Sequence, residues 1–482
     1  MTMTTTTLVR GTELRARFAV ALAEMYGAEV PAYTTLVEVS RAVNADVAAA
    51  LSQQGAEVGR YGSLERVTAE RHGAIRVGSE RELEQVGRVF AAFGMHPVGF
   101  YDLRDASASS VPVVSTAFRP VEPAELAENP FRVFTSMLAV DDARFFDAPT
   151  RARLERFVQE RHLFGEELLA LADRAAAEGG LPPDEAEQLL RLATDAFRLS
   201  TEPVDRAWYA HLERISAVAA DIGGVPATHI NHLTPRVLDI DDLYRRMSER
   251  GIAMIDEVQG PPAWEGPDVL LRQTSFRALA EERTFREADG SVVTGSLRVR
   301  FGEVEQRGIA LTAAGRDLYD RLTSEVDERR TAGDPRTRVE VAREVWREHL
   351  PRTEAEMVVA GLACGEVRLV DASRLPAGGG PTSVAELVAA GAVVVDPVVY
   401  EDFLPRSAAG IFQSNLTGAG TKDSGADGAE YDAERLSAIL GRPVADPVAL
   451  ATAQMQRSLD TLSAQLGAPL TLHTPDDSRT PA

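Results

Sequence analysis

The sequence has 482 residues, 44% of them hydrophobic and 26% charged, which is enough for two or three core-building units. Its net charge of −22 disfavours a nucleic acid or a membrane as partner, because proteins that bind phosphate usually carry a basic face. The sequence contains no signal-like apolar segment at its start and no membrane-length apolar run, so we expect a cytoplasmic protein. The single cysteine, Cys364, excludes an internal disulfide and a cysteine-based zinc site. Any metal must therefore be held by histidine and carboxylate side chains.

In chain order, the periodicity predicts an α+β protein with large helical insertions. Helical spacing covers residues 10–55. A strand, a helix and a second strand follow between 71 and 103, with a third strand at 110–120. Residues 123–220 are expected to be helical, strand signals return from 226 to 311, and most of the rest is helical. We divide the chain into an N-terminal helical segment (1–60), a first β-α-β module (61–122), a helical insert (123–225), a second β-α-β module (226–312) and a C-terminal helical region (313–482).

One short phrase occurs twice in the sequence. His72 is followed by Arg76 four positions later, and His232 is followed by Arg236 at the same spacing; a valine and a leucine also recur at equal offsets. Both phrases run into a helix that ends near a glycine and is followed by apolar strand residues. This pattern predicts two paired β-α-β-β-β units that form a cupped, half-open sheet. Within each strand, residues four apart share a face, so each histidine lies on the same face as its arginine.

The stretch "SLRVRFGEVEQRG" supplies a carboxylate that can accompany the two histidines. Treated as one continuous strand, it places Leu297, Val299 and Phe301 on one face, and this apolar row leads to Glu303. A buried carboxylate is costly unless a cation lies beside it, and a metal ion is one such cation. Glu305 shares the face of Glu303 and stays an alternative ligand.

Two histidines and one carboxylate on neighbouring strands form the facial triad that suits non-haem Fe(II) oxygen chemistry. A hydrolase or isomerase that uses Zn²⁺ or Mn²⁺ with the same ligands stays open, although the sequence has no HExxH helix. A non-catalytic binding protein that has kept the fold also stays open. We expect His229 to support the site structurally and Arg236 to form a structural ion pair.

Two resemblances to known families follow from these motifs. "HLTPRVLDIDDLYRRMSERG" and "GEVEQRG" resemble the histidine and glutamate strands of hydroxyphenylpyruvate dioxygenase, a member of the vicinal oxygen chelate superfamily, and this likeness selects Glu303 over Glu305. "RHGAIRVGS", "FRVFTSML", "NHLTPRVLDID", "FGEVEQRGIALT" and "YEDFLPRSAAGIFQSNL" together resemble the 2-oxoadipate dioxygenase/decarboxylase family over nearly the whole chain.

The second resemblance implies an Fe(II) enzyme of lysine degradation that converts 2-oxoadipate and O2 into (R)-2-hydroxyglutarate and CO2. It implies that Fe²⁺ is held by His72, His232 and Glu303. Arg76 and Ser407 would bind the substrate, and a loop at 400–416 would cover it. Where the family pattern has a small apolar residue, this chain has Arg406, which would pair with a substrate carboxylate or narrow the pocket. A different 2-oxo acid therefore stays an alternative substrate, and the sequence leaves the oligomeric state open.

Overall fold

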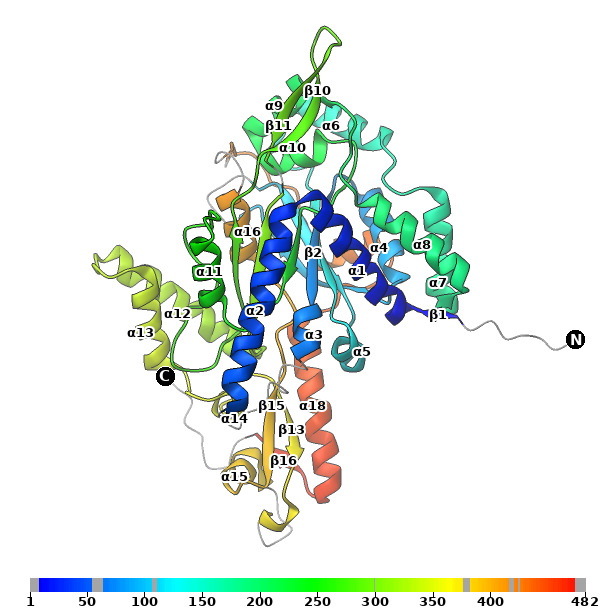
Figure 1. Cartoon of the computed structure of the whole chain (residues 1–482). Coiled ribbons are helices and arrows are strands. Elements are labelled where there is room, and N and C mark those ends of the chain that lie inside the picture. The colour runs from blue at the N-terminus through cyan, green and yellow to red at the C-terminus, as the bar shows by residue number, and fades with distance from the viewer. Residues whose placement is uncertain are drawn as a thin grey trace, which may run out of the picture.

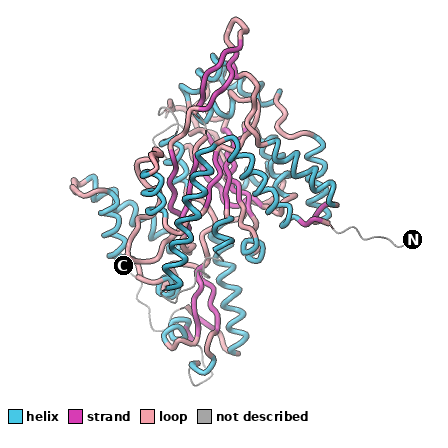
Figure 2. Tube along the Cα trace, viewed as in Figure 1, coloured by secondary structure: helices cyan, strands magenta, loops and turns pink. Residues whose placement is uncertain are grey.

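A curved sheet forms the centre of the molecule, and helices cover its outer side (Figures 1 and 2). The computed structural model describes residues 8–53, 64–105, 111–298, 300–375, 382–415, 420–423 and 425–472. Its mixed helices and open sheets confirm the predicted α+β class. No helix among these residues is both long and apolar enough to cross a membrane.

The first module has the element order β-α-β-β-β. It consists of β2 (Arg71–Val77), α4 (Glu80–Ala91), β3 (His96–Asp102), β4 (Val113–Arg119) and β5 (Arg132–Leu138). The strands lie in the order β3-β4-β5-β2, with β2 parallel to β5 and the other neighbours antiparallel. Ser79 caps α4 by accepting a 3.3 Å hydrogen bond from the backbone of Glu82. Leu83 and Phe90 then pack the apolar side of the helix onto the sheet.

The strand β5 falls inside the region that the sequence predicted to be a helical insert, 123–225. The first module therefore continues to Leu138 instead of ending at residue 122. All seven residues of β5 are buried, as are those of β2 and β4, but its polar residues Arg132, Thr135 and Ser136 have the i, i+3, i+4 spacing of a helix and not the alternation of a strand.

The second module repeats this arrangement. It consists of β8 (His232–Pro235), α11 (Ile240–Glu249), an extended segment at 254–259, β9 (Leu271–Phe276) and β12 (Gly302–Arg307). The segment 254–259 forms antiparallel bridges to β9, β9 is antiparallel to β12, and a parallel bridge from Arg236 to Glu305 joins β12 to β8. The resulting strand order, 254–259, β9, β12, β8, is that of the first module.

The two modules meet where β2 and β8 pair in antiparallel fashion. His72 lies opposite Thr234, and Ala74 lies opposite His232. The predicted duplication is confirmed, and the pairing brings the two repeated histidine phrases side by side. β2 is labelled at the centre of the molecule in Figure 1.

The continuous strand that we expected at 296–308 is wrong. Leu297 ends β11 (Val292–Leu297), which forms a hairpin with β10 (Glu281–Arg286) and joins β7 (Val204–Asp205) of the insert. Val299 lies outside the described residues. Arg300 is buried in ion pairs with Glu29, at 2.5 Å, and Glu281, at 2.5 Å, and these pairs hold the chain away from strand geometry before β12 begins.

Helices surround this centre. The predicted N-terminal helix is divided at Pro31 into α1 (Gly11–Glu29) and α2 (Pro31–Gln53), and α3 (Leu64–Ala69) leads into β2. The short strand β1 (Val9–Arg10) pairs with β6 (Gly180–Leu181). The insert contains α5 (Pro123–Glu128), α6 (Ala148–Glu160), α7 (Glu166–Glu178), α8 (Pro183–Ala196), α9 (Arg206–Ile215) and α10 (Ala217–Gly223).

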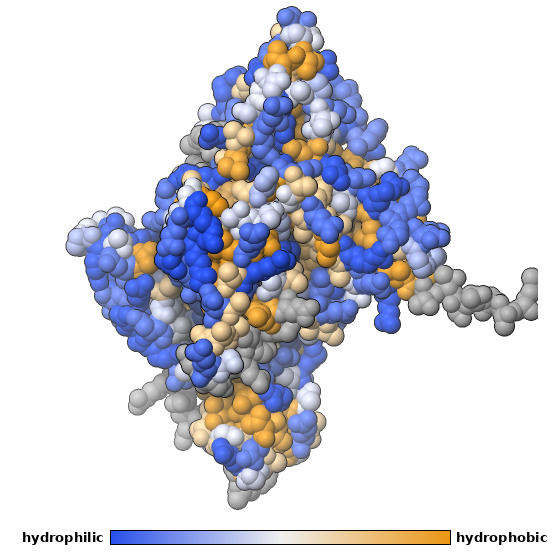
Figure 3. Space-filling view, in the orientation of Figure 1, coloured by the Kyte–Doolittle hydropathy of each residue, from blue (hydrophilic) through white to orange (hydrophobic). Residues whose placement is uncertain are grey.

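The C-terminal region forms a hairpin of helices and a separate small lobe. The hairpin is α12 (Ala313–Thr331) and α13 (Arg338–His349). The lobe contains α14 (Glu354–Val359), β13 (Gly365–Leu369), a 3-10 turn (Ala372–Arg374), β14 (Thr382–Ser383), α15 (Val384–Ala389), β15 (Val393–Pro397), α18 (Pro447–Leu466) and β16 (Leu470–Thr471). Two further helices, α16 (Pro405–Asn415) and α17 (Ala433–Leu440), pack against the modules. On the face shown in Figure 3 the surface is mostly hydrophilic, and hydrophobic residues gather over the lobe that contains β13 and β15.

Candidate metal centre

Three side chains that are far apart in the sequence meet where the two modules join. His72 of β2, His232 of β8 and Glu303 of β12 are all buried, and one donor atom from each lies within 4.8 Å of the others. The Nε2 atoms of both histidines are 3.4 Å from the Glu303 carboxylate, one at each oxygen. The side-chain amide of Gln273 on β9 donates to Glu303 and holds the carboxylate in place. This is a donor set that could hold a metal ion.

Glu305, the alternative ligand of the sequence analysis, contacts the other side of the His72 ring. Its carboxylate is 2.8 Å from His72 Nδ1 and receives two hydrogen bonds from Arg307, at 2.7 and 2.8 Å. Arg132 donates a further bond of 3.0 Å. Burial would raise the pKa of Glu305, but the Arg307 guanidinium, His72 and Arg132 outweigh burial and hold the pKa well below its usual range. Glu305 is therefore an anion that supports His72.

A buried network of charges continues outward from Glu305. Arg132 also bonds Glu70 at 2.8 Å and pairs with Glu401, while Arg236 bonds the other Glu70 oxygen at 2.9 Å. The network joins these three carboxylates to Arg132, Arg236, Arg307 and the partly buried Arg66, which lies 3.9 Å from Glu401, so opposite charges neighbour one another away from water. Arg236 thus has the ion-pair partner that the sequence analysis expected.

The two histidines occupy different electrostatic environments. Burial lowers the pKa of His232 to about 4, and neighbouring Glu303 only partly offsets the effect. For His72, burial alone would lower the pKa, but Glu305 and Glu303 outweigh it and raise the pKa. Phe301 packs on the His232 ring at 5.0 Å between centroids, and Phe403 packs on the His72 ring at the same distance. Neutral imidazole is the form that binds metal, and the dry surroundings of His232 favour it.

Arg76 lies on the same buried strand face as His72, as its spacing predicted, and forms an ion pair with Asp221 of α10. Asn231 donates a 3.0 Å hydrogen bond to the same Asp221 oxygen, and His229 Nε2 lies 3.5 Å from the other oxygen. Burial lowers the pKa of His229 to about 4. The insert therefore supplies a carboxylate that fixes the guanidinium beside the candidate metal ligands.

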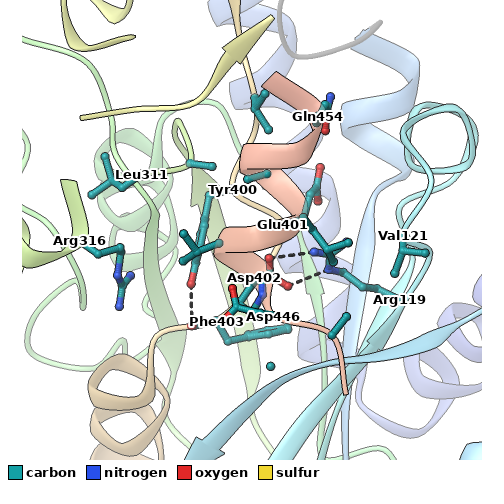
Figure 4. Close-up of a pocket in the computed structure, with 18 of the residues that line it drawn as sticks. Arg119, Val121, Leu311, Arg316, Tyr400, Glu401, Asp402, Phe403, Asp446 and Gln454 are labelled. Atoms are coloured by element: carbon teal, nitrogen blue, oxygen red, sulfur yellow. Dashed lines mark hydrogen bonds and ion pairs between the residues drawn. The ribbon is translucent and has the colours of Figure 1, made fainter. Parts of the chain in front are cut away.

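The segment before α16 is fixed against the first module (Figure 4). Asp402 accepts two hydrogen bonds from Arg119, at 2.7 and 2.9 Å, and the Tyr400 hydroxyl donates a 2.7 Å bond to the carbonyl of Phe403. These residues and Phe403 line a cavity of about 340 Å³, whose lining does not include His72. The Arg119–Asp402 ion pair and the Tyr400 hydrogen bond fix the backbone on either side of the Phe403 ring, which packs on His72.

The expected covering loop at 400–416 is largely the helix α16, which packs on β9. Asn415 at its end donates a 2.8 Å hydrogen bond to Ser275, the residue paired with Glu303 in the sheet. Ser407 is buried, whereas the Arg406 side chain is 75% exposed and lies 3.9 Å from Asp327 of α12. Substrate contact by Ser407 and Arg406 stays a prediction.

Sequence reasoning missed several residues of the site. Gln273 carries no motif signal, and Phe403 lies in the quoted stretch "YEDFLPRSAAGIFQSNL" without a role having been assigned to it. Asp221 does carry a sequence signal, because it is the single charged residue in α10, an otherwise apolar helix of seven residues. A lone charge among buried apolar neighbours predicts a buried partner of opposite sign. Glu305 was recognised as sharing the face of Glu303, but its role depended on His72 and Arg132 from neighbouring strands.

The fold and the site define the class: this is a protein of the vicinal oxygen chelate type, with paired β-α-β-β-β modules that bring two histidines and a glutamate together. The model of the 2-oxoadipate dioxygenase/decarboxylase family matches residues 18–415. The chain belongs to that family.

Relatives and solved structures agree with this assignment. The chain is 55% identical to a 2-oxoadipate dioxygenase/decarboxylase of Mycobacterium tuberculosis over 447 residues, which cover 92% of this chain and 97% of the relative. It is 39% identical to the protein of that name from Escherichia coli, with the same two coverages. The crystal structure of the hydroxyglutarate synthase of Pseudomonas putida in complex with 2-oxoadipate matches with a TM-score of 0.79 and 37% identity, covering 95% of this chain and 99% of that one.

Proposed function

We propose that this protein is an Fe(II)-dependent dioxygenase and decarboxylase that converts 2-oxoadipate and O2 into (R)-2-hydroxyglutarate and CO2. The observation that carries the proposal is the convergence of His72, His232 and Glu303 in a chain of this family. The complex of the Pseudomonas putida relative with 2-oxoadipate supports the choice of substrate. The reaction balances, since the six carbons and both oxygen atoms of O2 are accounted for in the two products.

The donor set fits iron. Two imidazoles and one carboxylate leave three coordination positions open, and this set is typical of non-haem Fe(II) oxygenases. When bound, iron would supply a binding site for the carboxylate and keto oxygen of a 2-oxo acid and the one-electron chemistry that O2 requires. The single cysteine is buried elsewhere in the chain and does not compete for the ion.

The remaining side chains bind and orient the substrate. Arg76 has the planar fork that pairs with a carboxylate through two hydrogen bonds, and Asp221 fixes its orientation before the substrate arrives. Phe301 and Phe403 cover the two imidazoles and keep water away from them. We propose that α16 closes the site on the β9 side, with Ser407 and Arg406 as further substrate contacts.

An oxygen electrode tests the proposal directly. Enzyme loaded with Fe(II) under anaerobic conditions is mixed with O2 and either 2-oxoadipate, 2-oxoglutarate or hydroxyphenylpyruvate. We expect 2-oxoadipate to be consumed fastest, with equal amounts of O2 used, CO2 released and 2-hydroxyglutarate formed. A preference for the aromatic acid would contradict the substrate assignment, and turnover without added metal would contradict the iron requirement. The location in the cytoplasm and the role in lysine degradation stay predictions.

A further inference from the structure

The imidazole of His72 lies between two carboxylates of the same strand. Residues two apart on β12 point to the same face, so Glu303 and Glu305 both reach His72. The Glu303 carboxylate is 3.4 Å from Nε2, and the Glu305 carboxylate is 2.8 Å from Nδ1. Each ring nitrogen therefore faces a different carboxylate.

The surroundings of Glu305 fix the direction of its bond to His72. Two bonds from Arg307 and one from Arg132 enter the same carboxylate, and a carboxylate that is paired with two guanidiniums is ionised and only accepts hydrogen bonds. His72 Nδ1 must then carry a proton, which leaves Nε2, the nitrogen that faces Glu303, as the one that can bind a metal. We infer that Glu305 is a positioning residue that sets the tautomer and the ring orientation of His72 for metal binding. This inference rests on the proposed function, because it assigns a role within the same metal site.

The second histidine has no equivalent support among the described residues. His232 Nδ1 is buried and makes no hydrogen bond there. The duplicated modules give the reason. Arg76 lies opposite Ser136 in the first module, and Arg236 lies opposite Glu305 in the second, so Ser136 and Glu305 occupy equivalent positions.

The Ser136 hydroxyl is engaged with Ser115 at 2.9 Å, and its side chain is shorter than that of glutamate. The first module therefore has no carboxylate to offer His232, whose ring is held by packing on Phe301. Of the two histidines, only His72 is held by a carboxylate, so we expect the loss of Glu305 to weaken metal binding through His72 alone.

Co²⁺ binding to the full chain tests the inference without turnover. Carboxylates that orient ligand histidines typically contribute a factor of ten to a hundred in metal affinity. We expect the Co²⁺ dissociation constant, measured by calorimetry and by visible absorption, to rise about tenfold in Glu305→Gln and about a hundredfold in Glu305→Ala. The glutamine keeps an acceptor for Nδ1, so a partial rescue by this isosteric variant is expected.

Glu70→Gln is the matched control. It removes a carboxylate from the same buried network, where Glu70 bonds Arg132 and Arg236, but it does not touch His72. We expect it to lower the melting temperature and to leave the Co²⁺ dissociation constant within about twofold of the wild type. Equal losses of affinity in Glu70→Gln and Glu305→Gln would overturn the inference, as would wild-type affinity in folded Glu305→Gln.

A second variant covers the case in which Glu305→Gln does not fold. Arg307→Lys keeps the positive charge and loses one of the two bonds to Glu305, so we expect about a threefold weaker Co²⁺ affinity. Unchanged affinity in this variant would contradict the inference. Wild-type protein that binds Co²⁺ but, with Fe(II), consumes no O2 with 2-oxoadipate would instead contradict the proposed function alone.

Discussion

The ion pair between Arg76 and Asp221 can be broken with one nearly isosteric substitution, Asp221→Asn. The Asp221 side chain is buried and accepts hydrogen bonds from Arg76 and, at 3.0 Å, from Asn231. Asparagine keeps the shape and one acceptor oxygen but removes the charge. The guanidinium then lies in a dry site with a weaker partner, and its fork is free to leave the orientation that we assign to substrate binding.

The expected effect follows from the chemistry of this contact. A hydrogen bond to a charged group contributes about 1.5–3 kcal/mol, and each 1.4 kcal/mol corresponds to a factor of ten in an equilibrium constant. We therefore expect the KM for 2-oxoadipate to rise about 10- to 100-fold in Asp221→Asn. The kcat should change much less, because Arg76 would hold the carboxylate equally in the bound substrate and in the transition state.

The assay is a double-mutant cycle with Arg76→Lys, which keeps the charge and loses the fork. Steady-state O2 consumption gives kcat and KM for the four proteins, and Co²⁺ affinity shows that the metal site is intact. Since Arg76 and Asp221 are in direct contact, we expect a coupling energy of at least about 1 kcal/mol. Asp205→Asn is the control, because Asp205 is in the same insert but forms an exposed ion pair with Arg153.

Two results would refute this reasoning. The first is a folded Asp221→Asn variant whose KM lies within about twofold of the wild type. The second is strict additivity of the two substitutions, which would mean that Asp221 does not act through Arg76.

Three other substitutions test separate parts of the site. Glu303→Gln should lose Co²⁺ binding and turnover together while the circular dichroism spectrum stays unchanged; retained metal binding would remove Glu303 from the ligand set. Phe403→Ala should destabilise the protein by about 3–5 kcal/mol in urea unfolding, because the ring packs on His72 and Phe134; a loss below 1 kcal/mol would contradict that packing. His229 has a pKa of about 4 in the folded protein and an ordinary pKa near 6.5 in the unfolded chain. Between pH 6.5 and pH 4 the unfolded chain therefore binds more protons, and the free energy of unfolding falls as the pH falls through this range. Between pH 7 and pH 5 this costs about 2 kcal/mol in metal-free protein, and His229→Asn should remove that part of the pH dependence; an unchanged slope would show that His229 is not buried as a neutral base.

The sequence predicted some strands of the two modules and missed or misplaced others. β2, β3 and β4 were recognised because turns and helices bound them, and the repeat of the histidine phrase predicted the duplication before any contact was known. β5 was missed because its polar residues, Arg132, Thr135 and Ser136, follow helical spacing and do not alternate with apolar ones. The strand that leads to Glu303 was predicted to be too long. Arg300 forms ion pairs with Glu29 and Glu281 just before β12, and the sequence could not show these pairs because Glu29 and Glu281 lie far from Arg300 in the chain.

The sequence by itself determined the candidate ligand types, their strand faces and the duplicated order of elements, because these depend on residue chemistry and on periods of two and 3.6 residues. Only the tertiary structure decided which carboxylate faces which nitrogen of His72, and that Arg76 pairs with Asp221 from the insert. Both outcomes depend on how β2, β8 and β12 pair and on where α10 packs. Side chains on one strand share a face by local geometry, but their partners come from segments that only the folded chain brings together.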